Sequence, residues 1–499
     1  MNFCEYKDKV RACWLGKNIG GTLGMPFEGK RHVFDVDYYT HDLSEGVLPN
    51  DDLDLQLIWL NAAEKHGKAL NAKMLATYWN AGVVAYWSEY GAAKNNIESG
   101  ILPPASGSFQ NTFRESNGAF IRSEIWACLA PGDPALAVKY AYEDACVDHA
   151  ENGIYAELFC AALQSAAFTE TNRDRLVEIA LSYIPADCAV ASAVKMVIDA
   201  YQSGLSWQET RKKILCVFPS TFGLMNCEDP DEDIPTGELG YDAPSNIALI
   251  VLGWLYGEGD FSKSICLAVN CGEDADCTAG TLAATFGILY GTDVFEERWL
   301  TPIGDEIKTI AINLADPWMG SVPRTVTNLT ERVVRLMPEF SAKNIRFSED
   351  GVMEIVPAEK QCSTQFRAGT FEYQNRYFYM YDKHLIAKDE NPMIEAYLST
   401  ETLVMSEGET KTFQLVFANK LWRQFWAKVS MNLPEGIVSD RSGEFRCMLH
   451  QYSDGNMYTE AEFTLTANEW KEAECSIDVV ISLDGYPDKI VLPVKLIRG

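Results

Sequence analysis

Two short acidic segments carry the residue types that hold cations. The first, residues 50–54, reads Asn-Asp-Asp-Leu-Asp and lies directly before an apolar helical run. The second, residues 273–278, reads Glu-Asp-Ala-Asp-Cys-Thr and lies directly before an Ala-rich helix ending at Tyr290. One carboxylate suffices to cap a helix N-terminus, whereas adjacent carboxylates repel one another. The repeated pairing indicates a shared counter-ion, and such oxygen ligands favour Mg²⁺ or Mn²⁺ over Zn²⁺. Spacing alone supports capping and metal binding equally.

The elements that must position these segments are helices. From the N-terminus to about residue 337, apolar residues recur at helical spacing. Beyond the runs that begin near residues 10, 53 and 74, helices are predicted at 118–130, 134–147, 153–168, 173–183, 188–203, 207–217, 244–257, 261–270, 275–290, 303–314 and 326–337. Glycines at positions 16, 20, 21 and 24 predict close helix packing rather than a phosphate loop, because their spacing is not GxGxxG after a strand. We expect an all-α domain over residues 1–340.

After Pro338 the pattern changes to a period of two. Aromatic and β-branched residues alternate in runs such as FEYQNRYFYMY, KTFQLVFAN, SIDVVISL and KIVLPVKLI. Turn signals at Pro434–Gly436 and Asp484–Pro487 separate the runs. The pattern predicts an accessory β-sandwich of immunoglobulin-like type over residues 345–499.

Composition excludes several classes of protein. The formal net charge of −29 opposes binding to nucleic acids and to anionic membrane surfaces. The fourteen cysteines form no CxxC pair and indicate buried thiols in a reducing compartment. No apolar leader and no apolar stretch of spanning length is visible, so we expect a cytoplasmic protein.

Five motifs occur in the order of a known family. They are GKNIGGTLGMPFEG, NDDLD, SNGAFIR, VDH and NCGEDADCTAGTLAATFGILYG, over about residues 10–300. Together they resemble the ADP-ribosylglycohydrolase family, which includes dinitrogenase-reductase activating glycohydrolases and ADP-ribosyl-acceptor hydrolases. The resemblance implies an all-α fold, a centre of two Mg²⁺ or Mn²⁺ ions, and hydrolysis of the bond between ADP-ribose and its acceptor. It does not extend to the β-rich half.

The resemblance also implies roles for single residues. Asp51 and Asp52 match the first pair of metal ligands, and Asp274 and Asp276 match the second pair. Glu28 matches a mobile acidic residue near the reacting ribose. The substrate side is matched by a loop that approaches the diphosphate and by a histidine lining the cleft, namely Ser116, Asn117, Gly118 and His149.

Three positions depart from the family pattern, which has Thr at each. Asn50 precedes the first pair, and its amide oxygen still suits Mg²⁺. Leu53 follows that pair, and Asp54 then adds a carboxylate. Cys277 follows the second pair, and a thiol is a poor ligand for Mg²⁺. Either Thr278 or a water replaces it as a ligand, or the site prefers Mn²⁺.

The chemistry that the resemblance implies is physically coherent. Cleavage of a ribosyl bond builds positive charge on the anomeric carbon. Two ions would orient the ribose hydroxyls and activate a water, and a carboxylate would move the proton. The candidates for that carboxylate are Glu28, Asp274 and Asp54. Arg122 meets either a phosphate or a neighbouring carboxylate, Glu115 or Glu124.

The sequence therefore predicts a metal-dependent glycohydrolase acting on an ADP-ribosyl or related ribosyl substrate. The alternatives are hydrolysis of another glycoside or nucleoside, and a non-catalytic binding or structural relative. The sandwich is expected to position large substrates, such as a modified protein, or to pair subunits in a homo-oligomer.

Overall fold

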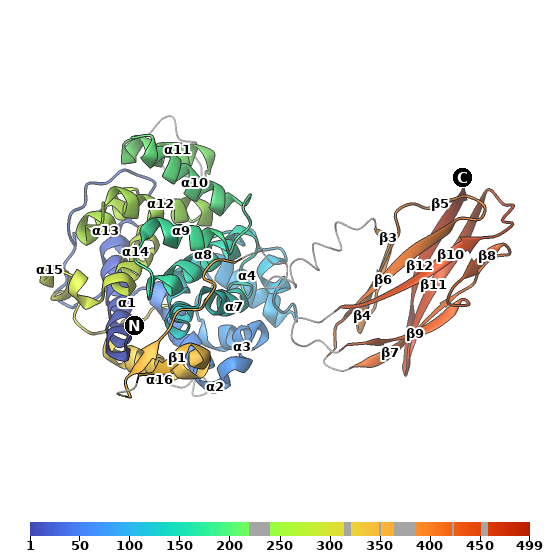
Figure 1. Cartoon of the computed structure of the whole chain (residues 1–499), viewed down its shortest axis with the longest axis horizontal. Coiled ribbons are helices and arrows are strands. Elements are labelled where there is room, and N and C mark those ends of the chain that lie inside the picture. Colours follow the sequence, from blue (N-terminus) through green and yellow to red (C-terminus); the bar gives the residue numbers. More distant parts are fainter. Residues whose placement is uncertain (219–239, 314–320, 349–350, 364–384, 422–423, 451–457) are drawn as a thin grey trace. The chain divides into compact units, whose positions relative to one another are not determined.

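The computed structural model describes residues 1–218, 240–313, 321–348, 351–363, 385–421, 424–450 and 458–499. Its contacts divide the chain into two compact units, Met1–Phe366 and Arg367–Gly499. The first unit is helical and the second is built from strands (Figure 1), which confirms the predicted fold class.

Sixteen α-helices lie in the described part of the first unit. They are α1 (Phe3–Gly24), α2 (Asp51–His66), α3 (Ala72–Gly82), α4 (Ser88–Glu98), α5 (Ala105–Ser108), α6 (Glu124–Leu129), α7 (Pro134–Ala145), α8 (Asn152–Ala167), α9 (Arg173–Leu181), α10 (Ala189–Gln202), α11 (Trp207–Val217), α12 (Ala243–Tyr256), α13 (Phe261–Asn270), α14 (Ala275–Tyr290), α15 (Glu297–Leu300) and α16 (Val326–Ser341). A short 3₁₀ helix, η1 (Met25–Phe27), follows α1.

Helices α1 and α14 approach each other through glycine, as predicted. A side chain at Gly20 would place its Cβ 2.2 Å from the carbonyl oxygen of Ala279, so only glycine fits there. Similar contacts join Gly16 to Ala283 and Gly24 to Ala275. This close packing fixes the first turn of α14, which carries the second acidic segment.

One predicted helix is absent, and three helices, α4 and the single-turn α5 and α15, were not predicted. Within 303–313 the backbone forms turns and isolated bridges instead of a helix, because its N–H groups bond to other segments. The amide of Ile307 donates to Arg324, and Ile312 forms a bridge with Val83. Helix α4 forms where the sequence, rich in Tyr, Asn and Gly, gave no helical period.

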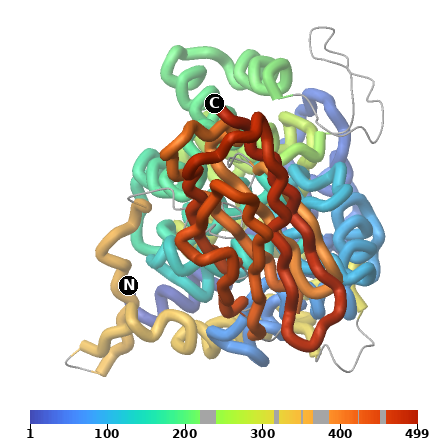
Figure 2. Tube along the Cα trace, turned by 90° about the vertical axis from the view of Figure 1, so that its right-hand side faces the viewer, coloured from blue at the N-terminus to red at the C-terminus, as the bar shows by residue number. Residues whose placement is uncertain are grey.

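The second unit is a sandwich of two five-stranded sheets (Figure 2). One sheet has the order β3 (Leu385–Glu390), β4 (Ile394–Ser399), β6 (Thr410–Asn419), β10 (Tyr458–Ala467), β8 (Ile437–Ser439). The other has the order β5 (Val404–Met405), β12 (Tyr486–Arg498), β11 (Glu474–Leu483), β7 (Phe425–Met431), β9 (Glu444–Leu449). Alternate residues of both sheets, such as Phe413, Phe463 and Ile481, share one buried core. The predicted strand over 371–381 lies outside the described residues.

A small hairpin belongs to the helical unit rather than to the sandwich. Strands β1 (Ile345–Phe347) and β2 (Met353–Ile355) pair with each other, and Ile355 donates to the carbonyl of Met1. The division at residue 366 therefore falls later than the predicted boundary at 340–345. Among the described residues, no helix is both long and apolar enough to cross a bilayer.

Candidate metal centre

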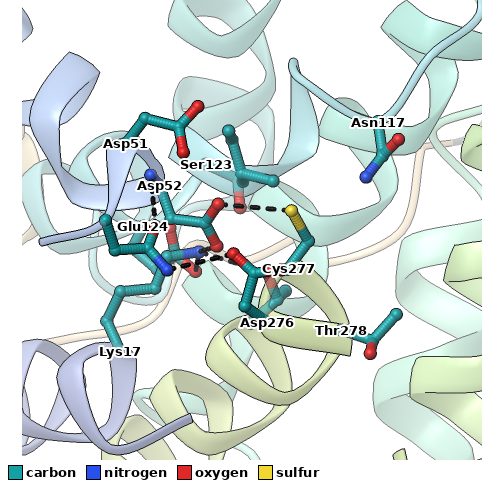
Figure 3. Close-up of polar contacts among 12 residues, drawn as sticks. Lys17, Asp51, Asp52, Asn117, Ser123, Glu124, Asp276, Cys277 and Thr278 are labelled. Atoms are coloured by element: carbon teal, nitrogen blue, oxygen red, sulfur yellow. Dashed lines mark hydrogen bonds and ion pairs between the residues drawn. The ribbon is translucent and has the colours of Figure 1, made fainter. Parts of the chain in front are cut away.

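The two acidic segments meet where α2 and α14 begin. The Asn50 side chain caps α2 by accepting from the amide of Asp52 at 2.7 Å, and its Nδ2 donates to Oδ2 of Asp276 at 3.1 Å. From the other side, Sγ of Cys277 donates to Oδ1 of Asp52 at 3.2 Å. Gly21 of α1 leaves the room that the Asn50 amide occupies, since a Cβ there would lie 2.8 Å from Nδ2. Segments far apart in sequence are thus joined by direct contacts (Figure 3).

Two groups of three ligand atoms share Asp276. One comprises Asp52, Asp276 and Cys277, and the other comprises Glu28, Asp274 and Asp276. Within each group the ligand atoms all lie within 4.8 Å of one another. Glu28 reaches the cluster from the end of η1.

The carboxylates of this cluster fit divalent cations. Oδ1 of Asp274 and Oδ1 of Asp276 are buried and accept no hydrogen bond from the described part of the protein. A buried anionic oxygen without a partner is costly unless a cation neutralises it. The donor set, mostly carboxylate oxygens, is the one that hard divalent ions prefer.

One lysine counters the cluster from within the core. Lys17 of α1, 2% exposed, lies 3.3 Å from Oδ2 of Asp52 and 3.2 Å from Oε1 of Glu124. Burial lowers its pKa, but the carboxylates of Glu124 and Asp52 more than reverse that effect, so the pKa of Lys17 is raised and the ammonium stays charged. Sequence reasoning missed this residue; its only signal was a lysine within the mostly apolar and glycine-rich second half of α1.

The electrostatics of the cluster are those of crowded anions. The carboxylate of Asp276, followed by burial, raises the pKa of Glu28 to about 9. Burial and neighbouring carboxylates raise the pKa of Asp51 and of Asp52 to about 6 each, although Lys17 opposes the rise at Asp52. Burial, then Asp276 and Glu28, raises the pKa of Asp274 well above its ordinary value. Each shift favours a proton or a metal ion on these oxygens.

The cluster opens into a pocket of about 190 Å³. Its lining joins the predicted residues Glu28, Asp51, Ser116, Asn117, Gly118, Asp274, Asp276 and Cys277 to Trp87, Ser88, Glu89, Tyr90, Ile121 and Tyr241. Sequence reasoning missed the second set, most of which lies at the start of α4. Of these, Tyr90 donates to Oδ2 of Asp51 at 2.9 Å and fixes that carboxylate.

The predicted substrate loop contacts a predicted metal ligand directly. The side-chain Nδ2 of Asn117 donates to Oδ2 of Asp274 at 2.5 Å, and the backbone N–H of Asn117 donates to the carbonyl of Tyr241 at 3.0 Å. His149 does not line the pocket; it is fully buried behind the loop, with Nε2 at 2.9 Å from Oγ of Ser116. Its position supports a role in holding Ser116 rather than in contacting substrate.

Arg122 lies in the core and does not line the pocket, so its position argues against a phosphate contact. Its guanidinium, fully buried, pairs with Asp144 at 2.7 Å and with Asp148 at 2.5 Å, and it donates to the carbonyl of Gly118 at 2.8 Å. The two partners expected from the sequence, Glu115 and Glu124, do not form this ion pair. Arg122 therefore anchors the substrate loop from behind.

Asp54 and Thr278 lie outside the cluster. The carboxylate of Asp54 accepts from the amides of Ile310 and Ala311 at 2.7 and 2.6 Å, so it holds that segment instead of facing the pocket. The hydroxyl of Thr278 donates to the carbonyl of Ala275 at 3.2 Å, one turn back along α14, and points away from the ligands (Figure 3). These positions argue against the predicted catalytic role of Asp54 and the predicted ligand role of Thr278.

A buried ion pair joins the two loops that present Glu28 and Asp274. Arg31 binds both carboxylate oxygens of Glu273, at 2.7 and 3.0 Å, and both residues are buried. Glu273 has a φ of 64°, a left-handed conformation that costs free energy for a residue other than glycine. The ion pair therefore stabilises a strained residue directly beside Asp274.

Comparison with known proteins identifies the helical unit. The sequence model of the ADP-ribosylglycohydrolase family matches residues 4–325, which is more than half of the chain. A solved structure described as an ADP-ribosylglycohydrolase-related protein complex superposes with a TM-score of 0.45 and 18% sequence identity, over 68% of this chain and 99% of that chain. No curated protein matches the chain significantly.

Proposed function

The chain belongs to the ADP-ribosylglycohydrolase family, and from this premise we propose that it is a metal-dependent glycohydrolase. The bond cleaved joins ADP-ribose, or a related ribosyl group, to its acceptor. One observation carries the proposal: carboxylates from three separate segments converge on one pocket, and oxygens of Asp274 and Asp276 are buried there without hydrogen-bond partners in the described structure.

The residues that would hold two Mg²⁺ or Mn²⁺ ions fall into the two groups that share Asp276. Asp52 and Cys277 complete one group, and Glu28 and Asp274 complete the other. Asp51 lines the same pocket, whereas the Asn50 amide, which donates to Asp276, supports the ligands from beside them. When bound, such ions supply positive charge that orients the sugar hydroxyls and activates a water.

The chain's own groups then handle the proton and the substrate. Glu28 is the most accessible carboxylate of the cluster, so it is the one best placed to exchange a proton with the water or the leaving group. Asp274 is held by Asn117, so the loop that receives substrate and the carboxylate beside the reacting carbon move together. Trp87, 49% exposed at the rim, offers an aromatic face to the bound molecule.

A second candidate is hydrolysis of a smaller glycoside or nucleoside. The pocket of about 190 Å³ is below the roughly 300–1,000 Å³ common for sites that enclose drug-sized ligands. It encloses a ribosyl group more readily than a whole dinucleotide-sized molecule. The same carboxylates would serve either substrate.

The proposal is tested by hydrolysis of ADP-ribosylated arginine and serine peptides with metal-stripped protein. We expect no release of ADP-ribose in excess EDTA and full recovery with Mg²⁺ or Mn²⁺. Full activity in EDTA would contradict metal dependence. A rise in melting temperature with ribose or a nucleoside, but not with ADP-ribose, would favour the second candidate. No rise with any sugar, and no bound metal at millimolar Mg²⁺, would favour a non-catalytic relative.

For the rest of the chain we propose a cytoplasmic setting. The sandwich, which lies outside the family match, would position a modified protein substrate or pair two subunits.

A further inference from the structure

The two ligand groups differ in one atom. The group of Glu28, Asp274 and Asp276 offers oxygen only, whereas the group of Asp52, Asp276 and Cys277 replaces one oxygen by sulfur. Divalent ions distinguish these donor sets: Mg²⁺ takes oxygen, whereas Zn²⁺ and related transition ions accept thiolate.

The sulfur of Cys277 is aimed into the centre. Cys277 is 6% exposed on the first turn of α14, and its Sγ contacts Oδ1 of Asp52 at 3.2 Å (Figure 3). The neighbouring hydroxyl of Thr278 is directed to the carbonyl of Ala275 and does not take the sulfur's place. The atom that this position offers to a cation is therefore the sulfur of Cys277.

A second, independent feature marks the place of a cation. Asp276 is 1% exposed, and its Oδ1 accepts no hydrogen bond from the described residues. Lys17 does not serve it, because its ammonium approaches Oδ2 of Asp52, 3.3 Å away. The carboxylate that carries this unpartnered oxygen thus places an oxygen within 4.8 Å of both the sulfur and an Asp52 oxygen.

We infer that the centre is of mixed character, with a thiophilic transition ion of the Zn²⁺ class held by Asp52, Asp276 and Cys277 beside a hard ion held by Glu28, Asp274 and Asp276. The inference deepens the proposed function, on which it rests for the use of these carboxylates. Binding forms the sulfur–metal bond and releases the thiol proton to the buffer, with no change in oxidation state. Asp276 would serve both ions, because it belongs to both groups.

Co²⁺, which has ligand preferences like those of Zn²⁺ but absorbs light, is the probe. We expect metal-stripped full-length protein to develop a near-ultraviolet thiolate-to-cobalt absorption that saturates at about one Co²⁺ per chain. Cys277→Ser should abolish this absorption. Cys266→Ser is the matched control, because Cys266 is also buried but lies on α13 away from the pocket, and it should keep the absorption.

One further measurement needs no variant, and a second carries its own folding control, because Mg²⁺ binding should persist in it. Zinc-edge X-ray absorption of the unmodified protein should show a sulfur scatterer at about 2.3 Å. Loss of a residue that only supports a metal ligand typically weakens metal affinity by about 10–100-fold. Loss of the ligand itself, in Cys277→Ser or Cys277→Thr, should therefore weaken Zn²⁺ binding at least about 100-fold. Binding of Mg²⁺ should be unchanged in both variants.

The outcomes separate the two proposals. Oxygen-only scattering, or a cobalt absorption that persists in Cys277→Ser, overturns the inference. If the protein then still hydrolyses its substrate with Mg²⁺, the proposed function stands without the mixed centre. If neither Mg²⁺, Mn²⁺, Zn²⁺ nor Co²⁺ binds, both fall.

Discussion

Two groups of buried aspartates in the helical unit meet opposite electrostatic conditions. Around Arg122, Asp144 and Asp148 are fully buried and each contacts the guanidinium at 2.7 Å or less. At the starts of α2 and α14, Asp274 and Asp276 are as deeply buried, yet each keeps an oxygen without a partner in the described structure.

The pKa of Asp148 reflects this difference, whereas at Asp144 burial outweighs Arg122 and raises the pKa to about 6. Burial raises the pKa of Asp148, but Arg122 and His149 outweigh it and bring the pKa down to about 2. Asp51 lies half-buried among other carboxylates instead, and desolvation followed by Asp52 raises its pKa to about 6. Around Arg122 the protein supplies the cation that neutralises the buried aspartates, and the ion pairs stabilise the fold. At the starts of α2 and α14 the negative charge is left without enough protein cations, as is typical of a site that binds a cationic ligand.

The largest expected effect comes from the residue that both ligand groups share. Asp276→Asn keeps the shape but removes one charge from each group. We expect turnover to fall at least about 10³-fold, equivalent to about 4 kcal/mol of transition-state stabilisation. Metal should no longer raise the melting temperature, whereas the metal-free protein should become more stable because repulsion among the carboxylates decreases.

The matched control for this variant is Asp199→Asn. Asp199 is an exposed aspartate on α10 and should leave both activity and stability unchanged. If Asp276→Asn instead destabilises the metal-free protein as much as loss of Asp144 or Asp148 does, the carboxylate of Asp276 is stabilising without metal, and the contrast with the aspartates around Arg122 is wrong.

The opposite result is expected at the paired group. Arg122→Met leaves Asp144 and Asp148 buried without their cation and should lower the free energy of unfolding by about 3–5 kcal/mol. Arg122→Lys keeps the positive charge but loses the bidentate geometry of the guanidinium. Its free energy of unfolding should therefore lie between those of Arg122→Met and the unmodified protein. Urea unfolding measures both; a loss below about 1 kcal/mol would show that the pairing is not what stabilises this group.

The pH dependence of stability should separate Asp148 from the crowded carboxylates, whereas Asp144, whose pKa burial raises to about 6, should behave like the crowded ones. The pKa values of Asp51, Asp52 and Glu28 are raised to about 6, 6 and 9, above ordinary values of about 4. The folded state then holds more protons than the unfolded state, so these groups favour folding below about pH 4 and lose that contribution as pH rises toward 9. Asp148, with its pKa lowered to about 2, contributes above about pH 4 and is unaffected over this range.

Metal ions bind the deprotonated carboxylates and should cancel this loss. The rise in melting temperature produced by Mn²⁺ should therefore increase from pH 5 to pH 8. In metal-free Asp276→Asn, the stability of the fold should decrease less steeply as pH rises. A Mn²⁺ effect that is constant across this range would contradict the assignment of these carboxylates as ligands.

The sequence predicted the unpaired group better than the paired one. Adjacent aspartates before two helices, together with family motifs, pointed to Asp51, Asp52, Asp274 and Asp276 because their spacing is local to each segment. Arg122 was assigned the wrong partners, since its pairing with Asp144 and Asp148 depends on how the following helices fold back.

Tertiary contacts also decided the remaining errors. Residues 303–314 have helical spacing, yet within 303–313 the amides of Ile310 and Ala311 bond to Asp54 and no helix forms. The same contacts argue against the predicted catalytic role of Asp54. Lys17 and the start of α4 had no local motif, and only packing brings them to the pocket.

The smallest expected effect concerns Thr278, two residues from Asp276. Its hydroxyl donates to the carbonyl of Ala275 within α14 and faces away from the ligands. Thr278→Val, which keeps the branched shape, should therefore cost only the roughly 0.5–1.5 kcal/mol of one hydrogen bond and leave metal affinity and turnover unchanged. Calorimetric metal titration beside Asp276→Asn is the direct comparison. Because the two positions lie on the same helical turn, a local distortion of α14 would affect both variants alike. A tenfold loss of metal affinity in Thr278→Val would mean that the first turn rotates on binding and that the hydroxyl, rather than the sulfur of Cys277, becomes the ligand.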